Sequence, residues 1–169
     1  PADHTVTCLC YSVLLKRQGK FDVTTANKLK IPVKYYKQLQ QGQQVEVSGK
    51  IIKPGMVVGP ERRGIKVCYC TDTRPTDKLI DFAREADLLI SEGMYGSNEE
   101  LEKAIQKKHM TFTESAEIAM NAKVQALWLT HYSPSLTEPG KYINEAKKIF
   151  PNTQAGTDLL MKTLMFSTD

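Results

Sequence analysis

The sequence Ala126-Leu-Trp-Leu-Thr-His131-Tyr-Ser-Pro134 decides which fold we expect for this chain. Its apolar run from Ala126 to Leu129 is typical of a short strand that is buried on both faces. The run ends at His131 and a Ser-Pro turn, so the histidine is expected at the carboxyl end of the strand, where α/β folds bind their ligands. His131 alone fits a hydrogen-bonded structural histidine as well as a metal ligand or a catalytic group.

Two other segments place polar residues at the ends of predicted strands. Residues 65–71 alternate and lead into Asp72, and the segment that begins at Asp3-His4 is interpreted as a strand that reaches Leu15. Two histidines and an aspartate are the ligand types of a hydrolytic zinc site. These residue types also occur at strand ends by chance, so the pattern alone does not establish a site.

The remaining pattern alternates strands and helices. Thr111 and Glu114 form a capping box that begins a helix reaching about Ala122. The alternation predicts an α/β fold with a mixed sheet and helices on one face. The other expected elements are a hairpin over 45–52, a helix after Pro75, a strand over 86–90, helices over 99–108 and 141–150, and one or two strands within 154–166.

Length and charge agree with one globular domain. The chain has 169 residues, 41% of them hydrophobic, and a net charge of +4, which is compatible with an anionic partner such as RNA without indicating one. No apolar run approaches the roughly 20 residues that cross a membrane. Because no secretory signal is visible, we expect a cytoplasmic protein.

Four cysteines form two alternating pairs, Cys8-x-Cys10 and Cys68-x-Cys70, each inside a predicted strand. Period-two spacing directs both members of a pair to one face of the sheet, which predicts buried, reduced thiols. A four-thiolate zinc site is the alternative, although it usually has two residues between paired cysteines. Disulfides are not expected in a cytoplasmic protein.

A basic and aromatic stretch lies between Asp22 and Glu46, where the sequence has no acidic residue. Lysines can bind a phosphate backbone and tyrosines can stack on nucleotides, so the stretch is a candidate RNA-binding segment. A solvated helical hairpin is the alternative. The candidate RNA-binding residues are Lys28, Lys30, Lys34, Tyr35, Tyr36 and Lys37.

These motifs together resemble the carboxyl half of ribonuclease Z, a family of the metallo-β-lactamase superfamily that removes the 3′ trailer from precursor tRNA. The resemblance spans nearly the whole chain in order and spacing. It is carried by Asp3-His4-Thr5-Val6 through Cys10-Tyr11, by Thr71-Asp72-Thr73-Arg74-Pro75, by His109-Met110-Thr111 with Glu114 and Ala116, and by Leu129-Thr130-His131-Tyr132-Ser133.

The resemblance implies half of an αββα sandwich, phosphodiester hydrolysis at two zinc ions, and a protruding tRNA-binding arm over residues 21–53. Asp72 would bridge the two ions, with His4 completing the first site and His131 the second. His109 would act as general acid toward the departing 3′ oxygen. Glu92 would hold His109 in position.

Two departures from the family pattern affect these expectations. Val33-Lys34 stands where the arm of the family usually has Gly-Pro, which puts the turn and the tRNA grip of the arm in question. The His-x-His-x-Asp-His metal cluster of the family does not occur in these residues. We therefore expect a carboxyl-terminal half that lacks its amino-terminal partner, is inactive alone and exposes an apolar sheet face.

Such a face normally finds a partner, so we expect a homodimer or a separately folded amino-terminal half. Two alternative functions stay open at this point. One is a metallo-β-lactamase-fold hydrolase that acts on another substrate. The other is a non-catalytic RNA-binding module.

Overall fold

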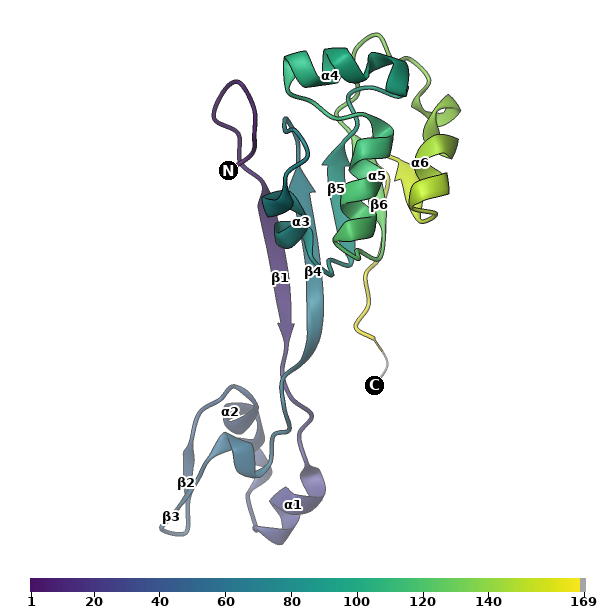
Figure 1. Ribbon diagram of the computed structural model, residues 1–169. Helices are drawn as coiled ribbons and strands as arrows, with labels where there is room; N and C mark the ends of the chain where they lie inside the picture. The colour runs from purple at the N-terminus through teal and green to yellow at the C-terminus, as the bar shows by residue number, and fades with distance from the viewer. Residues whose placement is uncertain (168–169) are drawn as a thin grey trace. The chain divides into compact units, whose positions relative to one another are not determined.

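A computed structural model describes residues 1–167 (Figure 1). The chain divides into two compact units. The first, which we call the sheet unit, comprises Pro1–Leu14 and Ile65–Met165. The second, the arm unit, comprises Leu15–Gly64 together with Phe166 and Ser167. The arm expected over residues 21–53 therefore lies inside a larger compact unit.

A five-stranded mixed sheet is built in the order β1-β4-β5-β6-β7. Strands β4 to β7 are mutually parallel, and Figure 1 shows β1 running in the opposite direction to β4. The mixed α/β architecture predicted from the sequence is thus confirmed. The strands are β1 (Tyr11–Arg17), β4 (Arg62–Cys70), β5 (Leu88–Glu92), β6 (Leu127–Thr130) and β7 (Thr153–Ala155).

Three helices pack on one face of this sheet (Figure 1) and form its core. They are α3 (Asp77–Ala83), α5 (Phe112–Asn121) and α6 (Ile143–Ile149), and a further helix, α4 (Leu101–Lys107), precedes α5. Helix α5 begins with the expected capping box, in which Thr111 and Glu114 bind each other's backbone N–H. Phe112, Leu89 and Leu129 are fully buried where α5 meets the sheet.

The amino-terminal segment differs from its predicted strand, because β1 begins only at Tyr11. Tertiary hydrogen bonds hold the preceding residues in a loop: the Asp3 N–H donates to Thr73 Oγ1 at 3.1 Å, and the Ala2 N–H donates to the Cys8 carbonyl at 2.9 Å. His4 therefore lies in a loop and not at a strand end. Cys8 and Cys10 likewise precede the strand and are only partly buried.

Two other sequence predictions are wrong in detail. In β6, Leu127 and Leu129 are fully buried, but Trp128 is only partly buried because it points to the face opposite the helices. After β7, the segment 156–166 contains no strand, and Leu159 and Met161 expose 94% and 90% of their surface. Cys68 and Cys70, by contrast, are fully buried as predicted.

Apolar side chains are exposed on β1 and β4. Tyr69 of β4 exposes 45% of its surface, and Tyr11 and Val13 of β1 expose 60% and 70%.

In the described residues, no helix is long and apolar enough to cross a membrane.

The arm unit has a small hydrophobic core of its own, formed by residues such as Ala26, Ile31, Leu39 and Ile52. Its hairpin turns at Ser48 and Gly49, both of which have positive φ, as a type I′ hairpin turn requires. Its elements are α1 (Val23–Lys28), α2 (Tyr36–Gln40), β2 (Val45–Val47) and β3 (Lys50–Ile52).

Candidate metal and catalytic site

The candidate site lies at the carboxyl ends of β4, β5 and β6, where parallel strands direct their following loops to one edge of the sheet. Asp72 follows β4 and His131 follows β6, and both have left-handed backbone conformations, with φ of 48° and 57°. Such conformations in residues other than glycine concentrate at functional sites. Each marks a sharp turn directly after a strand.

Four of the predicted residues converge there. Asp72 Oδ1 lies 2.8 Å from His131 Nε2 and 3.9 Å from His109 Nδ1. The His109 ring lies 4.9 Å from the His4 ring and 5.7 Å from the His131 ring, between centroids. His4 Nδ1 lies 2.9 Å from the Lys108 carbonyl, and if it donates there, Nε2 is left with its lone pair for another partner.

The side chains gathered here are of the types that bind zinc. Imidazole and carboxylate groups bind zinc at about 2.0–2.2 Å, so ligand atoms around one ion lie within roughly 4 Å of one another. One ligand atom each from His4, Asp72 and His109 lie within 4.8 Å of one another. This set fits a metal ion after small side-chain movements, and His131 lies within reach of the same carboxylate.

Glu92 is fully buried beside His109, and both oxygens of its carboxylate accept hydrogen bonds. The backbone N–H groups of Thr73 and Met110 donate to its carboxylate at 2.6 and 3.0 Å, and His109 Nδ1 lies 3.1 Å from Oε2. Burial raises the pKa of Glu92 to about 7, against the two backbone hydrogen bonds, which lower it. Glu92 therefore links the ends of β4 and β5 with the segment that carries His109.

His109 lies among charges of both signs. Burial is the main cause that lowers the pKa of His109, and the neighbouring His4 lowers it further, while Asp72 opposes both effects. A lowered pKa makes the imidazolium form a stronger acid and reduces its population at neutral pH. The ring position is compatible with coordination as well as with proton transfer, and measurement of metal content separates the two roles.

Arg74 connects three segments of the site. The sequence alone did not reveal this role of Arg74. Its backbone N–H donates to the Asp3 carbonyl at 3.0 Å, and its guanidinium donates to the His109 carbonyl at 2.5 Å. The same guanidinium forms a bidentate ion pair with Glu114, at 3.0 and 2.5 Å. Glu114 is in turn the third residue of α5 and part of its capping box, so Arg74 joins the loops of His4, Asp72 and His109 to one helix end.

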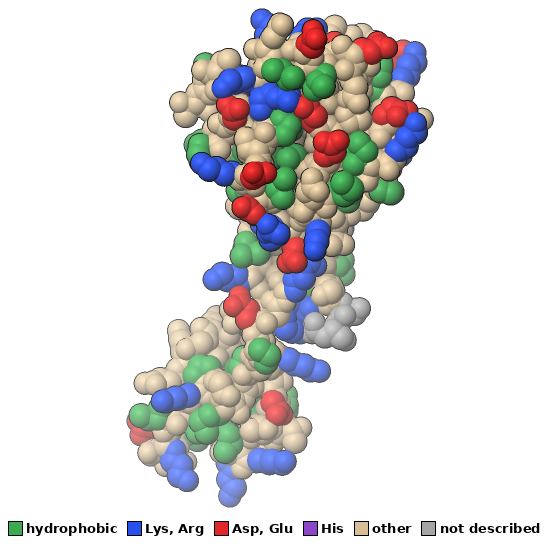
Figure 2. Space-filling view, in the orientation of Figure 1, with side chains coloured by type: hydrophobic (Ala, Val, Ile, Leu, Met, Phe, Trp, Pro, Cys, Tyr) green, Lys and Arg blue, Asp and Glu red, His purple; other side chains and the backbone are tan. Residues whose placement is uncertain are grey.

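The candidate RNA-binding residues of the arm unit fall into two groups. All four lysines are exposed, and Figure 2 shows basic side chains spread over this unit. The tyrosines are partly buried and pack on the core of the unit: the Tyr36 ring lies 4.4 Å from the Phe21 ring, and its hydroxyl donates to Asn27 at 3.2 Å. The Lys34 ammonium nitrogen lies over the Tyr35 ring, 4.9 Å from its centroid. The tyrosines therefore present only part of their surface to a ligand.

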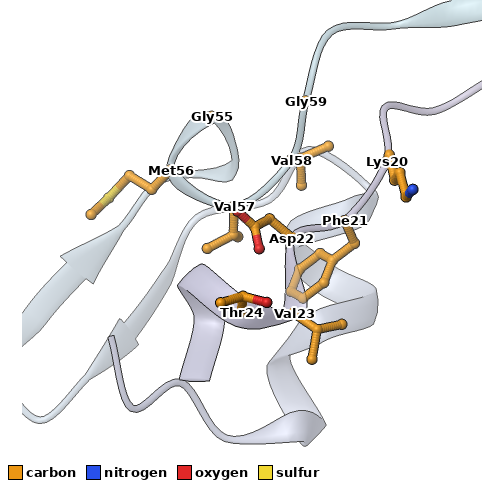
Figure 3. A pocket seen from close by; sticks show the side chains of 10 residues that line it. All are labelled: Lys20, Phe21, Asp22, Val23, Thr24, Gly55, Met56, Val57, Val58 and Gly59. Atoms are coloured by element: carbon orange, nitrogen blue, oxygen red, sulfur yellow. The ribbon is translucent and has the colours of Figure 1, made fainter. Parts of the chain in front are cut away.

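A cavity of about 650 Å³ lies in the arm unit, between the segments 20–24 and 55–59 (Figure 3). Its lining mixes apolar and polar side chains, among them Phe21, Val57 and Thr24. Asp22, which lines it, already caps α1 by accepting from the Thr25 N–H at 2.9 Å. The cavity thus lies where the arm unit closes its base, and it shares no residue with the His–Asp cluster.

The fold and the cluster agree with the comparison to known families. Residues 17–132 match the beta-lactamase superfamily domain, which is well over half of the chain. The chain belongs to the beta-lactamase superfamily.

Within that superfamily, the chain is similar to proteins named ribonuclease Z. It is 49% identical over all 169 residues to ribonuclease Z of Clostridium acetobutylicum, where the match covers 55% of that protein. It is 50% identical over 156 residues to ribonuclease Z of Lachnospira eligens, covering 92% of this chain and 51% of that protein. The chain thus spans about half the length of these relatives.

Two solved structures are similar to parts of this chain. A long-form RNase Z from yeast superposes with a TM-score of 0.41 at 36% identity, over 44% of this chain and 10% of that chain. The metallo-beta-lactamase fold protein YhfI from Bacillus subtilis gives 0.45 at 28% identity, over 53% of this chain and 35% of that chain. Because both scores are below 0.5, the fold assignment depends on the superfamily match and on the sheet itself.

Proposed function

We propose that this chain is the carboxyl-terminal half of an endoribonuclease that removes the 3′ trailer from precursor tRNA by zinc-dependent phosphodiester hydrolysis. The observation that carries the proposal is the convergence of three histidines and Asp72 at one sheet edge, in a chain similar to ribonuclease Z along its whole length. Two zinc ions per complete site, a cytoplasmic location and assembly as a homodimer belong to the same proposal.

The metal ligands of this chain would be His4, Asp72 and His131. Bound zinc supplies an activated water molecule, because it lowers the pKa of water to about 7. Asp72 would bridge the ions. Its left-handed backbone turns the side chain away from the strand direction, towards both flanking histidines.

His109 would donate a proton to the departing 3′ oxygen. Glu92 would orient it, because a carboxylate that accepts from Nδ1 leaves Nε2 as the atom directed at the leaving group. The two backbone N–H groups bound to Glu92 hold that carboxylate in place. Arg74, which binds the His109 carbonyl, would restrain the same loop from the other side.

The arm unit would bind the tRNA by its exposed lysines. Lys28, Lys30, Lys34 and Lys37 lie in a stretch without acidic residues, so their summed field favours a phosphate backbone. Tyr35 and Tyr36 pack on the core of the unit and would offer only ring edges or one ring face to a nucleotide.

Zinc analysis beside a cleavage assay tests the catalytic half of the proposal. With Asp72 shared, the chain supplies two protein ligands to each ion, and catalytic zinc sites have at least three. We expect substoichiometric zinc and no cleavage of a precursor tRNA by this chain alone. Mixing with the amino-terminal half of a ribonuclease Z relative should restore both. Stoichiometric zinc together with cleavage by the chain alone would overturn the half-site assignment.

Charge reversal tests the arm. Changing Lys28, Lys30, Lys34 and Lys37 to Glu should weaken tRNA binding and flatten its salt dependence by roughly one unit of log–log slope for each phosphate group that the arm no longer neutralises. The matched control reverses Lys78, Lys123, Lys147 and Lys162, four exposed lysines outside the arm unit, which changes the net charge equally. An equal decrease in tRNA affinity in both variants would contradict the proposal, because the arm lysines would then act only through the net charge of the protein.

A further inference from the structure

We propose that Asp3 and Lys108 form a positioning pair that presents His4 to the candidate metal site. Neither residue is among the proposed ligands and catalytic groups, and the role of the pair rests on the function proposed above, in which His4 binds zinc. Two contacts carry the proposal. The Lys108 ammonium lies 2.7 Å from Asp3 Oδ1, and the Lys108 carbonyl lies 2.9 Å from His4 Nδ1.

Asp3 is bound through each of its polar groups. Its backbone N–H donates to Thr73 Oγ1 at 3.1 Å, and its carbonyl accepts from the Arg74 N–H at 3.0 Å. Its carboxylate accepts from the Lys108 ammonium. The first two bonds fix the residue before His4 to the turn after β4, and the third fixes it to the end of α4. The main chain at His4 is therefore held by two segments that are distant in the sequence.

The backbone of Lys108 brings its carbonyl to His4. Lys108 ends helix α4 in the left-handed conformation, with φ of 55° and ψ of 51°. Glycine is the usual residue at such a position, because a β-carbon is strained at positive φ. The turn takes the chain out of the helix, and the Lys108 carbonyl bonds the His4 ring. A glycine would make the same turn without an ammonium group, so the turn alone does not account for the lysine.

The contact with the carbonyl selects one tautomer of His4. A carbonyl only accepts hydrogen bonds, so Nδ1 carries the proton and Nε2 keeps its lone pair. A neutral histidine binds zinc through such a lone pair, and the hydrogen bond at its other nitrogen fixes the orientation of the ring. The ion pair of Asp3 with Lys108 keeps the ring within reach of the carbonyl. The pair thus prepares Nε2 of His4 as a ligand atom before a metal ion binds.

Loss of the pair should act locally. The side chains of Lys108 and Asp3 keep 40% and 44% of their surface exposed, and an ion pair with that exposure contributes little to the free energy of unfolding. Metal affinity is more sensitive, because loss of a partner behind a ligand typically lowers it by about 10-fold to 100-fold. Removal of the pair should therefore change the His4 ring and its zinc affinity far more than the stability of the protein.

Nitrogen NMR of the chain measures the tautomer directly. Long-range proton–nitrogen correlations distinguish a protonated ring nitrogen from a bare one, and a His4→Gln variant identifies the His4 signals. The spectra are recorded with a chelator above about pH 8, where an ordinary histidine is neutral. We expect the wild-type His4 ring to be protonated at Nδ1 and bare at Nε2. A ring that is protonated mainly at Nε2, or divided equally between the tautomers, would overturn the proposal.

Three variants separate the pair from a general charge effect. Lys108→Met removes the donor and keeps the length of the side chain, Asp3→Ala removes the acceptor, and Lys107→Met removes the charge of the exposed neighbour as a matched control. In the first two variants, the His4 ring should divide between the tautomers at a nearly unchanged urea midpoint. After reconstitution with the amino-terminal half, their zinc affinity should fall by about 10-fold or more. Lys107→Met should match the wild type in all three measurements.

The outcomes separate this proposal from the proposed function. Wild-type tautomer and zinc affinity in both Lys108→Met and Asp3→Ala would contradict the positioning pair, and the tautomer of the wild-type chain decides the question even if a variant fails to fold. The predicted change of tautomer in a reconstituted protein that does not cleave precursor tRNA would support the positioning pair and refute the proposed function.

Discussion

Arg74→Ala should destabilise the sheet unit by about 2–3 kcal/mol. The guanidinium donates once to the His109 carbonyl and twice to Glu114. Hydrogen bonds to charged groups contribute about 1.5–3 kcal/mol each when buried, but these side chains keep 17% and 15% of their surface exposed, so water compensates for part of the change. For a chain of this size, the melting temperature should fall by roughly 5–10 °C.

Urea unfolding followed by the fluorescence of Trp128 measures this destabilisation, because the single tryptophan of the chain lies on β6 of the sheet unit. Arg74→Lys keeps the charge but not the bidentate geometry, and it should recover about half of the stability. Glu114→Gln keeps a side-chain oxygen for the helix cap. The double variant Arg74→Ala/Glu114→Gln, compared with the two single variants, should therefore reveal a coupling energy of about 1–2 kcal/mol between the two side chains. An Arg74→Ala protein whose free energy of unfolding lies within about 0.5 kcal/mol of the wild type would refute the stabilising role assigned to the bonds of Arg74.

Three further predictions concern the site and its core. In the complete enzyme, His109→Ala should lower turnover by about 100-fold with zinc content unchanged, and loss of zinc would identify His109 as a ligand. When a chelator keeps the site free of metal, burial favours the protonated form of Glu92 in the folded protein. The contribution of Glu92 to the free energy of unfolding is therefore fully present below about pH 4.5, and it falls by about 3 kcal/mol as pH rises through 7. Glu92→Gln should remove this pH dependence, as unfolding titrations in urea at several pH values will show. Phe112→Ala should cost about 3–5 kcal/mol in the same assay because Phe112 is fully buried, whereas Met161→Ala, at an exposed position, should change little.

Local signals in the sequence predicted those elements whose bonds join residues close in the chain. The capping box of Thr111 and Glu114 closes over three residues, and the turn at Ser48-Gly49 closes over two, so neither depends on the rest of the protein. The position of His131 after β6 followed in the same way from a short apolar run and the turn behind it. These are short-range effects that a single segment contains.

The tertiary structure alone decided what surrounds those elements. Asp3 bonds to Thr73, and Arg74 bonds to Glu114, across separations of 70 and 40 residues, and the first of these contacts replaces the strand that the β-branched sequence around His4 had indicated. The contact between Glu92 and His109 was predicted only through a family resemblance, since nothing local joins a strand end to a loop beyond the next helix. Backbone propensity acts over a few residues, whereas the packing of distant segments determines which donors and acceptors meet. Short-range signals in the sequence therefore determined the capping box, the hairpin turn and the place of His131 after its strand, and the tertiary structure determined where the amino-terminal strand begins and which polar residues form the site.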